Sequence, residues 1–190
     1  MIVPLFPLRG IFLYPGAVLP LMIFEPRYRQ MVEDLLDTAG RLVIATTVGD
    51  QDPGFTLDFL PRVHPVAGLG EIAGHERLPD GRFLIAVYGL DRVQIEELPS
   101  DRLYRQVEAT PLEERGLAAR DEPVVRGRLE TLLRERGGEA LRIPGDFPTE
   151  RLIDVLMMQS SATPDEIARV YGLSDIAERA EAALGHFTSP

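Results

Sequence analysis

The stretch FPLRGIFLYPGAVLPLMIFEPRYRQMVEDLL, residues 6–36, decides how the rest of the chain is interpreted. Prolines interrupt the apolar residues in it and just before it: Pro4, Pro7, Pro15 and Pro20. Because proline donates no backbone hydrogen bond and fixes φ, this segment can be neither a continuous helix nor an uninterrupted central strand. Pro15 and Gly16 supply the preset φ and the tolerance of positive φ that a tight turn needs after Tyr14. We therefore expect a strand, a turn and a second strand.

An amphipathic helix is predicted to follow these strands. Apolar residues recur there at helical spacing: Tyr28, Met31, Val32, Leu35 and Leu36. Arg27 falls on the opposite, polar face. Pro26 suits the first helical turn and Gly40 lies just beyond the last, so the pattern predicts a helix of about three turns.

Further strands are predicted in the first half of the chain. Residues 42–48 and 83–88 are apolar on both faces, which is typical of strands covered on both sides. Gly89 is expected to break the second of these runs. A continuation with one wet face follows at residues 93–98, and a final strand falls within residues 103–112.

Glycine and proline mark the connections between these strands. Residues 63–75 contain three glycines, which predict a bulged or sharply bent strand: Gly68, Gly70 and Gly74. The sequence Pro79-Asp80-Gly81 predicts the turn of a hairpin. A short strand is permitted by the alternation of three apolar residues: Phe55, Leu57 and Phe59.

Helices replace strands after Pro123. Apolar stripes at helical spacing predict about four helices, with Thr149 and Ser174 as caps of the second and the fourth. The third has the strongest start signal, because Thr163 is followed by Pro164 and, three residues on, by Glu166, as in a capping box.

These elements predict an α+β fold. Residues 1–115 form a β-rich lobe, a twisted and mostly antiparallel sheet that curls into a partial β-barrel with one packed helix. Residues 120–188 form a helical bundle lobe, and the two lobes together make one domain.

Composition excludes several functions. The chain has 190 residues, a net charge of −10 and no cysteine, and all of its basic residues are arginine. Disulfides, thiolate nucleophiles and cysteine-ligated metals are therefore excluded, and without lysine there is no phosphate-binding Walker loop and no serine–lysine dyad. The negative charge argues against nucleic acid. No apolar run is long enough to span a bilayer and no signal peptide precedes the first strand, so we expect a cytoplasmic protein that binds no membrane.

The opening stretch also resembles a known family. The FPLR strand, the YPGAVLPL segment and the FEPRY step into a helix are similar to the start of the Lon protease N-terminal, substrate-binding domain. Residues 68–98, GLGEIAGHERLPDGRFLIAVYGLDRVQIEEL, resemble the hairpin of the same domain. The resemblance implies a freestanding, non-catalytic module, because the ATPase and protease modules of full Lon proteases would lie beyond residue 190.

The resemblance further implies that the protein recognises unfolded or apolar polypeptide segments, without a cofactor or metal and with a protease or chaperone as a partner. The opening strands carry few polar residues, so some of their side chains are expected to face a ligand or a partner. The predicted peptide-binding residues are Phe12, Tyr14, Met22, Arg27 and Tyr28. A structural or dimer-forming adaptor, including a homodimer, is the alternative, and a small hydrolase is a weaker one.

Overall fold

A computed structural model describes residues 1–49, 61–137 and 142–188 of the chain. The short strand predicted at Phe55, Leu57 and Phe59 lies outside these residues. The chain divides into two compact units, Met1–Leu112 and Glu113–Pro190, and each is described by itself. Within the described residues, no helix has the length and apolar character needed to cross a membrane.

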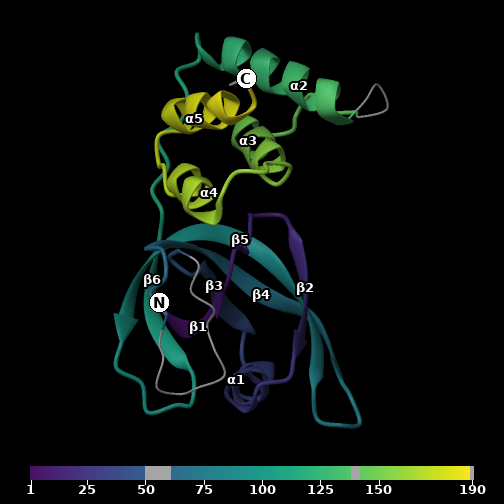
Figure 1. Ribbon diagram of the computed structural model, residues 1–190, viewed down its shortest axis with the longest axis vertical. Helices are drawn as coiled ribbons and strands as arrows, with labels where there is room; N and C mark the ends of the chain where they lie inside the picture. The colour runs from purple at the N-terminus through teal and green to yellow at the C-terminus, as the bar shows by residue number, and fades with distance from the viewer. Residues whose placement is uncertain (50–60, 138–141, 189–190) are drawn as a thin grey trace. The chain divides into compact units, whose positions relative to one another are not determined.

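In the part of the first unit that the structure describes, six strands form one sheet and one helix accompanies it (Figure 1). Its elements are β1 (Ile2–Leu8), β2 (Val18–Ile23), α1 (Pro26–Leu36), β3 (Arg41–Thr46), β4 (Val66–Arg77), β5 (Phe83–Leu98) and β6 (Arg105–Pro111). The strand order is β2-β5-β4-β3-β1-β6, and β6 also pairs with β5. The sheet thus curls until its last strand meets its second, which closes a circuit of hydrogen-bonded strands. All pairings are antiparallel except that of β1 with β3.

The strand β5 makes this closure possible because it is long. Its first part pairs with β2 and its second part, from Val93 onward, pairs with β6, while β4 lies along its other edge. The prediction that Gly89 breaks this strand was wrong, since the strand continues through it. Leu90 is skipped in the pairing with β4, and this bulge bends the strand without ending it.

The prolines do interrupt the opening segment as predicted, since β1 ends at Leu8 and β2 begins at Val18, but Pro4 and Pro7 themselves lie in an interior strand of the sheet. β1 lies between β6 and β3, but its two neighbours cover different residues. β6 pairs with Ile2 to Leu5, whereas β3 pairs with Leu5 to Leu8. Each proline therefore has a neighbour on one side only, and its missing N–H faces the side where no strand of the sheet pairs with it.

Glycines let one segment cross the sheet at very short range. Residues 11–14 are not a strand, contrary to the expectation of two adjoining strands, but pass over β4 and β5. A Cβ atom added at Gly68 would collide with the backbone of Leu13, and one at Gly89 with the carbonyl of Tyr14. The predicted turn follows directly, with Gly16 at φ 81° and Ala17 donating to the Tyr14 carbonyl at 3.0 Å.

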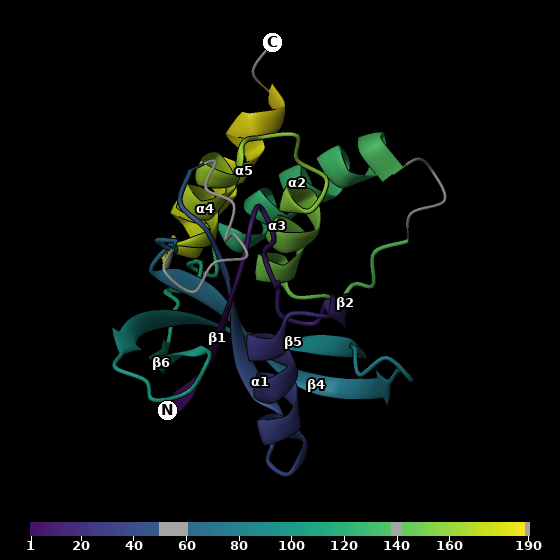
Figure 2. The same cartoon turned by 60° about the horizontal axis from the view of Figure 1, so that its bottom comes forward.

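The helix α1 lies against the sheet and closes its core (Figure 2). The predicted stripe is buried except for Leu36, which is exposed at the last turn. Arg27, predicted on the polar face, is also buried, and its guanidinium pairs with Glu25 and lies over the Tyr28 ring. Residues that meet α1 across the core come from several strands: Phe6, Ile23, Leu42, Ile44, Phe83, Ile85 and Val87.

The second unit consists of α2 (Glu122–Gly137), α3 (Thr149–Met157), α4 (Pro164–Tyr171) and α5 (Ile176–Thr188). The capping box of Thr163 and Glu166 is present as predicted. The other two caps differ from the prediction. Pro148 precedes α3 in the cap position, and the Asp175 side chain rather than Ser174 accepts from a first-turn amide of α5.

Candidate functional site

The five predicted peptide-binding residues do not share one exposed surface. Met22 is 51% exposed and Phe12 is half-buried. Tyr14, Arg27 and Tyr28 are buried, with exposed fractions of 4%, 8% and 4%. Of the five, Met22 thus offers the largest exposed fraction to a ligand, and its neighbours define the candidate site.

Met22 belongs to a group of exposed apolar residues on β2 and β5, here called the apolar strip. The register places Val18 opposite Tyr88 and Met22 opposite Leu84. Directly opposite residues of an antiparallel pair point to the same face, so all four side chains share one side of the sheet. Their exposed fractions run from 38% for Leu84 to 59% for Val18.

The sequence did not predict this strip because one face of β5 is open although its residues are apolar on both faces. Residues 83–88 were predicted to be covered on both faces, but only Phe83, Ile85 and Val87 are buried. Leu84 and Tyr88 alternate with them and face outward. An apolar residue at every position is the only signal in the sequence, and it does not distinguish a covered face from an open one.

The apolar strip consists of two cross-strand pairs, Val18 with Tyr88 and Met22 with Leu84, and a row of smaller residues lies between these pairs. Pro20 of β2 lies opposite Ala86 of β5, which in turn lies opposite Gly74 of β4. A Cβ atom added at Gly74 would have no atom within 4 Å, so the space above it is open. The face therefore offers larger apolar side chains on both sides of a low central row.

The strand β2 stands at the end of the strand order, and among the described strands it pairs with β5 alone. Such an edge can accept an extended segment through backbone hydrogen bonds. Pro20 removes one donor from the middle of this edge because proline has no N–H. The edge therefore suits side-chain recognition on the face of the sheet better than continuous strand addition.

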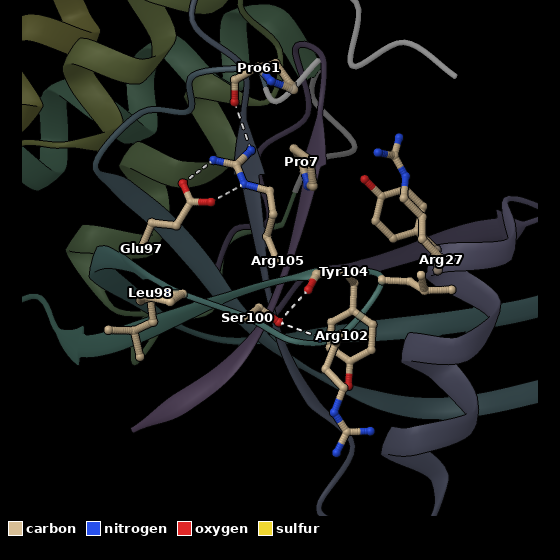
Figure 3. Close-up of a pocket in the computed structure, with 12 residues that line it drawn as sticks. Pro7, Arg27, Pro61, Glu97, Leu98, Ser100, Arg102, Tyr104 and Arg105 are labelled. Carbon is tan, nitrogen blue, oxygen red and sulfur yellow. Dashed lines mark hydrogen bonds and ion pairs between the residues drawn. The ribbon is translucent and has the colours of Figure 1, made fainter. Parts of the chain in front are cut away.

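A separate cavity of about 380 Å³ lies at the start of α1 (Figure 3). It brings together Arg27 and Tyr28, two of the predicted residues. Its other walls come mainly from the segment before β6: Pro7, Pro61, Glu97, Leu98, Pro99, Ser100, Arg102, Leu103, Tyr104 and Arg105. Pro7 belongs to the part of β1 that has no β6 neighbour, so the gap in the sheet forms part of the cavity.

Each arginine in the cavity wall is paired with a carboxylate. Arg105 donates two hydrogen bonds to Glu97, at 2.7 and 2.5 Å, and a third to the Pro61 carbonyl at 2.8 Å (Figure 3). Arg102 pairs with Asp34 at 3.0 Å. Arg27 pairs with Glu25, as described above. The cavity therefore has no excess of positive charge with which to hold an anion.

Both tyrosines of this cavity keep their protons to high pH. Burial raises the pKa of Tyr28 to about 12, against a smaller lowering by Arg27. Burial also raises the pKa of Tyr104 to about 12, with help from the hydrogen bond that its hydroxyl donates to Asp34 at 2.8 Å. Neither group is available as a base near neutral pH. Among the described residues, no group of three or more His, Cys, Asp and Glu side chains could hold a metal ion.

The family model of the ATP-dependent protease La (LON) substrate-binding domain matches residues 2–189. The chain belongs to this family. The Lon protease of Dictyoglomus thermophilum is 26% identical over 161 residues, which are 83% of this chain and 19% of that protein. The Lon protease of Trichlorobacter lovleyi is 30% identical over 132 residues, 68% of this chain and 15% of that protein. The sequence resemblance to Lon N-terminal domains is thereby confirmed.

The fold agrees with this membership. The N-terminal domain of the Mycobacterium avium complex Lon protease superposes with a TM-score of 0.74 and 18% identity, covering 100% of this chain and 99% of that one. At this identity the likeness shows the fold alone, which confirms the predicted α+β class. The chain spans about a fifth or less of the length of the two Lon proteases it matches.

Proposed function

We propose that the protein binds apolar segments of unfolded polypeptide on the apolar strip and does not cleave them. The observation that carries this proposal is the exposure of Val18, Met22, Leu84 and Tyr88 on one face of the sheet. Exposed apolar side chains in a contiguous group are typical of interaction surfaces. Membership in a substrate-binding family supports a polypeptide as the ligand.

The chemistry of the strip fits a tolerant recogniser. Methionine is flexible and polarizable, and tyrosine supplies a large contact area with few rotatable bonds. Met22 and Tyr88 therefore suit ligands of varied shape. The affinity of such a surface should be in the micromolar range, which corresponds to roughly −8 kcal/mol.

The test is the binding of a fluorescent apolar peptide of about a dozen residues, followed by anisotropy. The double variant Met22→Ser and Leu84→Ser should weaken binding at least about tenfold, because truncation of central anchors costs on the order of 1–2 kcal/mol each. The control is the pair Ile2→Ser and Val124→Ser, which removes apolar side chains that are more exposed than Met22 and Leu84 but lie outside the strip. Equal losses in the two double variants would count against the strip.

Two other outcomes separate the alternatives. If Leu103→Ser weakens binding and the strip variant does not, the cavity at the start of α1 is the binding site, because Leu103 lines it. If the protein sediments as a species whose mass rises with its own concentration and binds no peptide, the strip serves self-association, which is the function of the dimer-forming adaptor. We also propose that a protease is a partner of this protein. This is tested by adding the isolated protein to a reaction in which a Lon protease digests the polypeptide that the protein binds.

A further inference from the structure

The strand β4 continues the face of the sheet that carries the apolar strip. At the positions beside the strip, β4 carries charged side chains, whereas β2 and β5 carry apolar ones. β4 pairs with β5 so that Glu71 lies opposite Tyr88 and Glu76 lies opposite Leu84. Each glutamate thus extends one row of the apolar strip. One row reads Val18, Tyr88, Glu71 and the other reads Met22, Leu84, Glu76, with the small residues between them.

Both carboxylates are open to solvent and to a ligand. The Glu71 side chain is 44% exposed, and its cationic neighbour Arg41 approaches only to 3.6 Å and is itself 43% exposed. Glu76 is exposed, and none of the cations in the described part of the chain forms an ion pair with it. Exposed pairs such as that of Glu71 with Arg41 are weak, so an incoming cation can compete for the carboxylate.

The opposite end of the rows has little free positive charge to balance these groups. Arg82 donates to the Met22 sulfur at 3.3 Å, but its guanidinium is paired with Asp80 at 2.7 Å. The chain as a whole carries a net charge of −10. The β4 side of the strip, where a ligand leaves the apolar surface, thus carries two exposed carboxylates, while the nearby Arg77 is paired with Glu33 and Arg41 only loosely with Glu71.

From this charge pattern we propose that the protein selects apolar segments that carry arginine or lysine at their flank, and disfavours those flanked by aspartate or glutamate. The inference rests on the proposed function, since it assigns the ligand class of the same surface. A segment whose apolar side chains cover the strip places its next residues over β4, within reach of Glu71 and Glu76. Aspartate or glutamate at that position would be repelled by the two carboxylates. The two glutamates therefore disfavour acidic segments as well as attracting basic ones.

The test uses three peptides with one shared apolar core and flanks of two arginines, two glutamines or two glutamates. The arginine peptide should bind roughly two- to tenfold more tightly than the glutamine peptide, because each exposed ion pair contributes a few tenths to about one kcal/mol. The glutamate peptide should bind most weakly. Added salt should reduce the differences in affinity between the three peptides and leave the affinity of the glutamine peptide nearly unchanged.

A matched pair of variants separates local from global charge. Glu71→Gln with Glu76→Gln should abolish the preference for arginine. Glu96→Gln with Glu108→Gln changes the net charge equally on two exposed glutamates of β5 and β6 that face each other in register, and it should leave the preference intact. A preference that falls equally in both double variants, or is absent in the parent, overturns the inference while the proposed function stands. Failure of all three peptides to bind overturns both.

Discussion

The guanidinium of Arg179 donates a hydrogen bond to the carboxylate of Asp154 in the interior of the helical unit, where their side chains are 1% and 4% exposed. Arg179 comes from α5 and Asp154 from α3, so the pair joins two helices that are separated by α4 in sequence. Glu114, from the segment before α2, approaches the same guanidinium at 3.8 Å.

Removing one partner of this pair should destabilise the helical unit. Asp154→Asn leaves a buried arginine without its principal counter-charge, and such changes cost about 3–5 kcal/mol. Glu181→Gln is the control, because it breaks the exposed pair with Arg128 and should cost less than about 1 kcal/mol. Urea unfolding followed by circular dichroism measures both. Similar losses in the two variants would mean that burial does not set the strength of the Arg179 pair.

The glycines beneath the crossing segment should not tolerate a methyl group. Gly89→Ala places a carbon against the Tyr14 carbonyl, which is backbone and cannot swing away. Overpacking of this kind costs about 1–3 kcal/mol or prevents folding. Gly74→Ala lies in the same pair of strands over open space and should change the melting temperature little. The idea fails if Gly89→Ala melts at the temperature of the parent protein.

Tyr14 should act in folding and not in binding. Its ring is buried, so Tyr14→Ala should lower the free energy of unfolding by about 3–5 kcal/mol, the range for loss of a buried aromatic ring. Peptide affinity, measured well below the melting temperature, should not change. Tyr14→Phe keeps the ring and should recover most of the stability. Loss of affinity without loss of stability would restore Tyr14 to the binding site.

Alkaline pH should weaken the sheet unit through its buried tyrosines. The pKa of Tyr28 rises from 10.0 to about 12 on folding, so the unfolded chain loses this proton first as pH rises. The stability that Tyr28 contributes is complete below pH 10.0 and is lost as the pH approaches about 12. Unfolding titrations across this range should therefore show falling stability, with a shallower slope for Tyr28→Phe. An unchanged slope would assign the fall to other groups.

The protein should neither hydrolyse ATP nor cleave casein. A Walker phosphate loop and a serine–lysine dyad both require lysine, and the sequence contains none. Phosphate release and casein digestion are measured with and without ATP. ATP-dependent cleavage that persists through a second tagged purification would contradict this prediction.

Local chemistry made part of the structure predictable. The capping box at Thr163, the turn at Gly16 and the hairpin turn at Gly81 each depend on a few adjacent residues, and all three occur. The strands predicted at residues 42–48, 63–75, 83–88, 93–98 and 103–112 also form, with the third and fourth joined in the single strand β5. The parallel pairing of β1 with β3 was not predictable in this way, because strand partners are chosen by packing between distant segments.

The binding surface was predictable only in part. A shortage of polar residues on the opening strands indicated that some side chains face outward, and Met22 does. The same shortage could not assign individual residues. Tyr14 is buried because glycines let its backbone approach the sheet, and that approach is set by β4 and β5 far along the chain. Leu84 and Tyr88 looked like core because nothing local shows that one face stays open.

The pairing of β1 with β6 has a consequence for synthesis on the ribosome. Val3 of β1 pairs with Val107 of β6. Because β6 is the last strand of this unit, β1 lacks this partner until β6 has been synthesised. Long-range pairings of this kind slow folding, often to milliseconds or longer. During that interval β1 exposes backbone groups that could join a neighbouring nascent chain. Pro4 and Pro7 remove two donors from the waiting strand, so the residues that make β1 unusual as a central strand also make it a poor partner for the wrong chain.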